Sequence, residues 1–388
     1  MLVTIIIFIA ILAVLVLVHE WGHFITARRA GIKVEEFGFG FPPRAIGIYK
    51  AKDGRWKAVG RKVAQADSTI YSFNWLPLGG FVRIKGEQGE SESDPDSFAS
   101  RSVGRRIWII SAGVLMNLVL TVFLISLGFL IGLPQVIDKS IPPSANIKDE
   151  RIQIIEVVEG LPASRQGIVL GDTIASVDGL TISTLDEIQD YLDSKIGQEV
   201  VVTIRRGDET ITQSITPEIL EETGRGGIGV GLVNVALVSY PVHLALWNGI
   251  VTTINLFWLI IVAFYELFVS LVSGHGVTVD ISGPVGIAVI TGQVARLGFL
   301  YVLQFAALLS LNLAIINFLP FPALDGGRVF FLILGKLKGK PIDIKTETIA
   351  HNIGFFILML LVLLVTVRDI SKFGDKFSSW WQSFAGLL

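Results

Sequence analysis

Four apolar segments, each close to the length of a bilayer-spanning helix, constrain this chain most strongly. They are Leu2–Ala27, Ile107–Leu133, Phe299–Phe318 and Ile353–Val367. A spanning helix needs about 20 apolar residues, and the last segment is the shortest of the four. Only 17% of the 388 residues are charged and the mean hydropathy is +0.63, whereas a soluble protein carries about 25% charged residues. The sequence therefore predicts a polytopic α-helical membrane protein with four transmembrane helices.

The charges between these segments predict an orientation. The stretch Arg28–Arg106 holds 15 basic and 9 acidic residues, whereas Arg151–Glu222 holds 5 basic and 14 acidic residues. Loops rich in Lys and Arg stay in the cytoplasm, so the first stretch is expected inside and the second outside. Lys336, Lys338 and Lys340 mark another cytoplasmic loop. We expect a plasma (inner) membrane protein with both termini extracytoplasmic. The first segment lacks a basic start and a cleavage site, so a cleavable signal peptide is not expected.

The sequence HEWGH interrupts the first apolar segment. His19 and His23 are four residues apart and share one helix face, where two imidazoles can bind one Zn²⁺. Glu20 beside them can act as general base. A chance match, with polar groups used for helix packing, is the alternative, but ionisable groups inside a membrane are costly and usually functional. Arg28 follows five residues after His23, so the site is expected roughly 7–8 Å inside the cytoplasmic boundary.

A third metal ligand is expected from NFLPFPALDGGR, at Asn317–Arg328. The chain has no cysteine, so only His, Asp or Glu can complete the site. Pro320 and Pro322 break the helix, and Gly326–Gly327 allows a close turn. Asp325 is the lone carboxylate in this apolar stretch. Its alternative role is to cap a helix at the membrane exit.

The two motifs together resemble those of the site-2 protease family of intramembrane zinc metalloproteases, HExxH and NxxPxPxLDG. Phe37–Arg44 (FGFGFPPR), Tyr71–Glu87 (YSFNWLPLGGFVRIKGE) and Ser282–Ala288 (SGPVGIA) resemble the bacterial subgroup that includes the regulator-of-sigma-E protease. The resemblance covers nearly the whole chain, apart from about the last 20 residues.

This resemblance implies roles for individual residues and a zinc cofactor. Glu20 is the implied general base, Asn317 matches an asparagine that holds the substrate backbone or the oxyanion, and Asn312 is a further candidate. The implied zinc ligands are His19, His23 and Asp325. The implied reaction is hydrolysis of peptide bonds inside transmembrane segments of single-pass proteins, such as anti-sigma factors or remnant signal peptides, after another protease has trimmed them. The implied environment is the lipid bilayer, and no nucleic-acid partner is expected.

The acidic extracytoplasmic region resembles a single PDZ domain. Val157–Ile182 has strand-like runs and Gly-rich turns, and a short helix is expected near Leu185–Leu192. Gly224–Leu232 alternates glycine with apolar residues as a PDZ peptide-binding loop does, in a permuted position, although a plain connecting turn fits it equally. PDZ domains bind an extended peptide at a sheet edge.

The stretch around Pro77–Gly80 predicts a membrane-associated β-hairpin beside the active site, because apolar and polar residues alternate on both sides of it. A solvated loop hairpin is the alternative. An edge formed by Gly79, Gly80, Phe81 and Val82 could hold substrate extended.

A fifth apolar stretch, Leu244–Val272, is long enough to span but is expected to lie along the outer surface as an amphipathic helix. A further crossing would put the last ligand and the lysine-rich loop on the wrong side. Asn248, Thr252, Asn255 and Glu266 recur on one helix face.

The expected organisation follows from these assignments. It comprises a first transmembrane helix with HExxH (1–30), a cytoplasmic-side loop with the hairpin (31–103), a second transmembrane helix (104–134), the PDZ domain (145–235), the interfacial helix region (240–297), a third transmembrane helix with LDG (298–335), a fourth (350–368) and a tail (369–388). A catalytically idle relative that binds membrane proteins through its PDZ domain and a metal-dependent transporter are the competing functions.

Overall fold

The computed structural model describes residues 2–385 except 62–65, 88–92, 138–140, 142–143, 182–183, 208, 221–223 and 275–281. The chain divides into two compact units. The first comprises Met1–Leu124, Val251–Gly292 and Phe305–Leu388, and the second comprises Ile125–Ile250 and Gln293–Gln304.

Five helices of the described chain are long and apolar enough to cross a bilayer. They are α1 (Leu2–Arg29), α2 (Val103–Ile131), α5 (Val242–Ser273), α7 (Phe299–Phe318) and α9 (Ile344–Ala385). Two shorter helices are α6 (Pro284–Leu297) and α8 (Asp325–Leu337). Because α5 meets the same limits of length and composition as the other four, the four-span topology stays a prediction.

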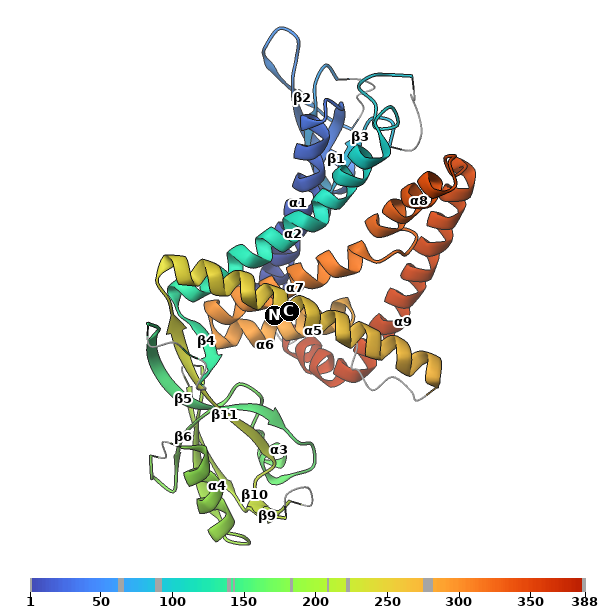
Figure 1. The fold of residues 1–388 in the computed structure, drawn as a ribbon. Helices are drawn as coiled ribbons and strands as arrows, with labels where there is room; N and C mark the ends of the chain where they lie inside the picture. The colour runs from blue at the N-terminus through green and yellow to red at the C-terminus, as the bar shows by residue number, and fades with distance from the viewer. Residues whose placement is uncertain are drawn as a thin grey trace. The chain divides into compact units, whose positions relative to one another are not determined.

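A small β-sheet follows directly on α1. The helix ends at Arg29, and the left-handed conformation of Gly31 (φ +72°) accompanies a hydrogen bond of 3.0 Å from Ile32 N to Ala27 O, as is usual at helix ends. The next strand begins at Val34, so the sheet lies at the C-terminal end of α1 (Figure 1). Its strands are β1 (Val34–Lys50), β2 (Trp56–Val59) and β3 (Ile70–Ile84).

Strands β1 and β3 are interleaved rather than paired as one hairpin. Phe39 of β1 pairs with Gly80 on one side and with Phe73 on the other. The hairpin pairing predicted within Tyr71–Glu87 is therefore wrong, because the first half of β1 lies between the two halves of β3. Gly80–Ile84 pairs only with β1 among the described strands, so it forms an edge of the sheet.

A buried ion-pair network holds these two bent strands together. Glu36 accepts hydrogen bonds from Arg44 Nε (2.8 Å) and Arg83 Nη2 (2.9 Å). Burial opposes ionisation, but the bonds from Arg44 and the charge of Arg83 hold the pKa of Glu36 below its ordinary value.

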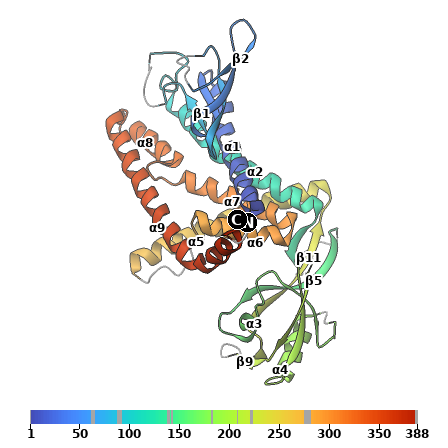
Figure 2. The same ribbon diagram turned by 180° about the vertical axis from the view of Figure 1, so that it is seen from behind.

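Prolines separate the last three helices of the first unit. α7 ends at Phe318, Pro320 and Pro322 follow, and α8 begins at Asp325; proline cannot donate a helical hydrogen bond. In both views α8 lies beside the first part of α9 (Figures 1 and 2). The helix break predicted from the two prolines is confirmed.

The second unit contains a six-stranded sheet with two small helices. Its strands run in the order β4-β11-β5-β6-β7-β8. Val200, Val202 and Ile204 of β7 alternate into a core with Ile154 and Ile188, as a half-buried strand requires. The bounds are β4 (Leu133–Val136), β5 (Asn146–Val157), α3 (Pro162–Arg165), β6 (Thr173–Val177), α4 (Leu185–Ser194), β7 (Val200–Arg206), β8 (Glu209–Ile215), β9 (Glu218–Ile219), β10 (Gly226–Gly227) and β11 (Val230–Ser239).

Local sequence explains the helix α4 of this unit. Thr184 and Glu187 form a reciprocal capping box at its start, which satisfies two backbone donors of the first turn. The short helix expected near Leu185–Leu192 is confirmed. β11 follows the other strands in sequence yet lies between β4 and β5.

Candidate metal centre and active site

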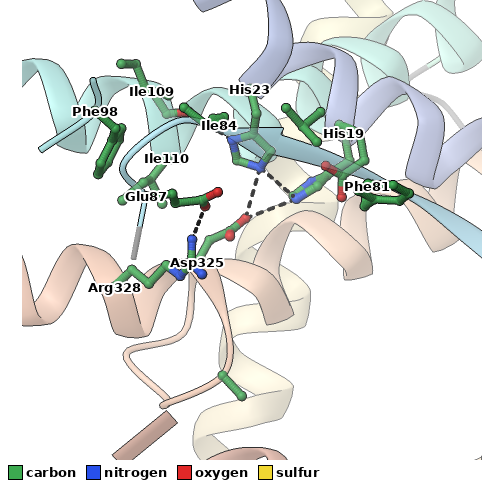
Figure 3. Close-up of a pocket in the computed structure, with 13 residues that line it drawn as sticks. His19, His23, Phe81, Ile84, Glu87, Phe98, Ile109, Ile110, Asp325 and Arg328 are labelled. Atoms are coloured by element: carbon green, nitrogen blue, oxygen red, sulfur yellow. Dashed lines mark hydrogen bonds and ion pairs between the residues drawn. The ribbon is translucent and has the colours of Figure 1, made fainter. Parts of the chain in front are cut away.

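Two histidines of α1 and the first residue of α8 converge in the first unit. The distances are 3.0 Å from His19 Nε2 to Asp325 Oδ2, 3.4 Å from His23 Nε2 to the same oxygen, and 3.2 Å between the two Nε2 atoms. Figure 3 shows the three side chains pointing toward one another. Among the described residues they form the one cluster of at least three His, Asp or Glu side chains able to hold a metal ion.

The neighbouring helix α2 fixes the second histidine. His23 Nδ1 lies 2.9 Å from the carbonyl oxygen of Ile109. A carbonyl can only accept, so Nδ1 carries a proton, and in the neutral ring Nε2 then keeps its lone pair for a metal. Gly113 of the same helix gives the rings room, because a Cβ there would lie 2.4 Å from His23 Nε2.

The turn before Asp325 is anchored to α9. Ala323 has a left-handed backbone (φ +82°), which is strained for a residue with a Cβ, and its N–H donates to His351 Nδ1 at 2.8 Å. Gly354 lies one turn further along α9, and a Cβ there would lie 2.3 Å from the Pro322 oxygen. Gly326 has no room for a Cβ either, which would lie 2.3 Å from two carbonyl oxygens. This packing sets the position of the Asp325 carboxylate.

The donor set fits zinc. Two imidazole nitrogens and a carboxylate oxygen are ordinary zinc ligands, and catalytic sites use three protein ligands with a fourth position open. Ligands about 2.0–2.1 Å from a tetrahedral ion lie roughly 3.3–3.4 Å apart. The separations of 3.0, 3.2 and 3.4 Å between the three donor atoms are close to that value.

A cavity of about 260 Å³ adjoins these donors. Glu20 lines it, and the backbone N–H of Val82 on β3 faces the Glu20 carboxylate. The sheet edge and the carboxylate therefore meet at the cavity wall. An acid beside a metal set, with an apolar wall, is the arrangement of a hydrolytic site.

The structure does not bring every predicted residue to the cavity. Phe81 and Val82 line it, and a Cβ on Gly80 would lie 3.6 Å from Glu20 Cγ. Asn317 and Asn312 are not among the residues that line it, and Asn312 Nδ2 donates to Leu308 O of its own helix at 3.0 Å. Gly79 packs near Phe41, where its positive φ (+87°) bends β3.

Sequence reasoning missed two charged residues of the cavity. Arg328 Nη1 forms an ion pair with Glu87 Oε1 (Figure 3). Both residues stand at the ends of motifs quoted above, KGE and DGGR, and their opposite charges were the available signal.

Long apolar helices that carry a three-ligand metal set and an adjacent carboxylate define a membrane-embedded metallohydrolase. Residues 7–361 match the model of Peptidase family M50. One relative is a protein of Clostridium perfringens that is named as a zinc metalloprotease. It is 35% identical to this chain over 357 residues, which cover 92% of this chain and 95% of the relative.

Two further similarities concern nearly the whole chain and a part of it. The regulator of sigma-W protease RasP of Bacillus subtilis is 29% identical over 450 residues, covering 95% of this chain and 98% of the relative. The PDZ domain of an SdrC-like protein from Listeria monocytogenes is 26% identical, with a TM-score of 0.21, covering 22% of this chain and 92% of that one.

The chain belongs to peptidase family M50. It is a multi-pass membrane protein and a zinc-dependent intramembrane metalloprotease, which confirms the predicted family, activity and cofactor.

Proposed function

We propose that this protease cleaves transmembrane segments of single-pass proteins after another protease has removed their outer domains. The observation that carries the proposal is the convergence of His19, His23, Asp325 and Glu20 at one cavity walled by apolar helices. Anti-sigma factors and remnant signal peptides are the proposed substrate classes. The name of the Bacillus subtilis relative, regulator of sigma-W protease, favours the first of them.

The roles proposed for the chain's own groups follow from the geometry. His19, His23 and Asp325 hold zinc, which when bound supplies a Lewis acid that polarises the scissile carbonyl and acidifies water. Glu20 takes the proton of the attacking water and returns it to the leaving amine. The N–H of Val82 faces the Glu20 carboxylate. Asn317 is proposed to donate to the substrate backbone or the oxyanion, with Asn312 as a helper.

The edge of β3 is proposed to hold the substrate in an extended form. Backbone groups alternate in direction along a strand. Lys85 N donates inward to Lys33 O at 3.0 Å, whereas the N–H of Val82 faces Glu20. Gly80, Val82 and Ile84 accordingly present their N–H groups on the open side. A substrate strand paired there would present a peptide bond beside the general base, whereas a helix would shield it.

The proposed topology places the zinc site near the cytoplasmic face, with both termini and the PDZ domain outside. α5 is proposed to lie along the outer surface rather than to span. One observation supports this: the side chains of Asn255 and Glu266 are exposed on α5. Polar groups exposed on an apolar helix fit the interface better than the hydrocarbon.

The second unit is proposed to bind an extended peptide as a PDZ domain. β4 pairs with Val235–Val238 of β11 and does not reach the first residues of β11. Val230–Val233 therefore has only β5 as a strand partner among the described residues. This open stretch follows Gly229, whose φ is +78°, in the predicted peptide-binding loop.

Zinc content measured together with cleavage of a model transmembrane peptide tests the proposal. Bound zinc with cleavage that Glu20→Gln abolishes is the expected result. Bound zinc without any cleavage by the native protein, but with capture of membrane proteins through the PDZ domain, would support the idle relative. Metal flux into proteoliposomes would support the transporter. Co-purification with the Glu20→Gln variant then identifies substrates.

A further inference from the structure

Three residues on one face of α2 lie against the histidine pair of α1. Ile109, Gly113 and Asn117 are spaced by four residues, as are His19 and His23, so each set follows one helix face. Ile109 O bonds His23 Nδ1, and Gly113 leaves room for both rings. Asn117 is the third residue of this face of α2, and its side chain faces His19.

The Asn117 side chain faces the ring nitrogen of His19 that points away from Asp325. Its Nδ2 lies 3.3 Å from His19 Nδ1. The residue is 0% exposed, and its Oδ1 has no hydrogen-bond partner among the residues that the structure describes. A buried amide oxygen without a partner is costly, so this orientation of the amide leaves its hydrogen-bonding capacity incompletely used.

Metal ligation through Nε2 requires the proton of a neutral imidazole to sit on Nδ1. That Nδ1–H then needs an acceptor, because the partner of the second nitrogen fixes the tautomer and the ring orientation. His23 has such an acceptor in Ile109 O. For His19 the group within reach is the Asn117 amide, whose Oδ1 comes to face Nδ1 when the amide turns over about its terminal bond; amide O and N are nearly isosteric.

We propose that Asn117 is a positioning residue for zinc binding, which presents Oδ1 to the protonated Nδ1 of His19 and so frees Nε2 for the metal. The inference rests on the proposed ligation of zinc by His19. An amide suits the position because it can meet either tautomer of the ring, donating to a bare Nδ1 and accepting from a protonated one.

Packing around Asn117 supplies a matched control. Ser310 Oγ of α7 donates to the backbone carbonyl of Asn117 at 2.9 Å, and Thr121 Oγ1 donates to the same oxygen at 2.9 Å. Ser310→Ala therefore removes a buried hydrogen bond at this residue without touching the amide or His19. A purely structural role of Asn117 would respond to Ser310→Ala in the same way as to loss of the side chain.

The experiment measures zinc affinity by competition with a chelator on the full-length protein in detergent. Asn117→Leu is expected to weaken zinc binding about 10- to 100-fold, the usual effect of losing such a partner. Asn117→Asp keeps an acceptor for Nδ1–H and should bind zinc within a few-fold of the native protein. Ser310→Ala should leave zinc affinity unchanged. If Asn117→Leu does not fold, Asn117→Ala removes the amide without adding volume.

Native zinc affinity in Asn117→Leu, or equal weakening in Asn117→Leu and Asn117→Asp, would overturn the inference. His19→Ala is measured alongside. If His19→Ala loses zinc but Asn117→Leu binds it with native affinity, only the role of Asn117 is rejected, and His19 remains a ligand. Retention of zinc in His19→Ala rejects the ligand assignment itself, and the inference with it.

Discussion

Gly113 of α2 lies directly against His23 of α1, so closely that a Cβ on Gly113 would be 2.4 Å from Nε2 and 2.8 Å from the His19 Cε1 atom. Contacts under 3 Å do not occur without displacement, and here the neighbouring groups are two rigid imidazole rings rather than the ends of flexible side chains. Both the close approach of α1 to α2 and the geometry of the metal site therefore depend on the absence of a Cβ at Gly113.

Gly113→Ala should reduce zinc occupancy severely, because the imidazoles must move apart to admit the methyl group. Gly104→Ala is the matched control, since no atom of the described residues lies within 4 Å of a Cβ at Gly104, near the start of the same helix. Metal content of both purified variants checks the prediction. Full zinc occupancy in Gly113→Ala would show that the rings can be displaced without loss of the site.

Glu20→Gln should keep zinc and lose hydrolysis. We expect cleavage to fall at least about 10²-fold, the typical contribution of an acid–base group, because glutamine cannot accept the water's proton. Glu266→Gln, a change at an exposed residue of α5, should cleave normally. Near-native cleavage by Glu20→Gln would exclude Glu20 as the base.

Asp325→Asn should lower zinc stoichiometry, because it removes the negative charge that balances the metal. His19→Ala and His23→Ala should do the same. Asp343→Asn, an exposed acid just before α9, serves as control. Should purified Asp325→Asn hold a full equivalent of zinc, the third ligand must lie elsewhere.

Val82→Pro should weaken binding of an extended substrate peptide while zinc content stays constant. Proline removes the N–H on the open side of the edge, which is the N–H that faces Glu20. The measurement is therefore made in the Glu20→Gln background, where binding is not confused with loss of the base. Arg83→Pro removes an inward N–H and should instead disrupt the sheet. Equal peptide affinity with and without Val82→Pro would contradict pairing at this edge.

Single cysteines can report the topology, because the chain has no cysteine of its own. A cysteine at Ser273, the end of α5, should react with a membrane-impermeant thiol reagent outside intact cells. A cysteine at Lys338, the C-cap of α8, should react only after permeabilisation. Gly276, another suitable site, lies outside the described residues. Protection of Ser273 with external labelling of Lys338 would reverse the proposed orientation.

The sequence predicted the parts of the fold that depend on local pattern. Apolar length marked α1, α2, α7 and α9, and the spacing of His19 and His23 marked one helix face. It could not predict the strand between the halves of β3, because Phe39 and Gly80 are brought together only by long-range pairing. The same holds for Asn117, whose role depends on which face of α2 meets α1.

The turn that carries Asp325 rests on a helix far beyond it in sequence. His351 holds the N–H of Ala323, and Gly354 lets α9 press against Pro322. A shortened chain ending before Ile344 would keep every metal ligand and the base, yet it would lose the hydrogen bond from the Ala323 N–H to His351. Such a truncation should lose zinc much as Asp325→Asn does, and normal metal content in it would refute this dependence. The smallest piece of this polypeptide able to keep its metal thus extends well past its last ligand.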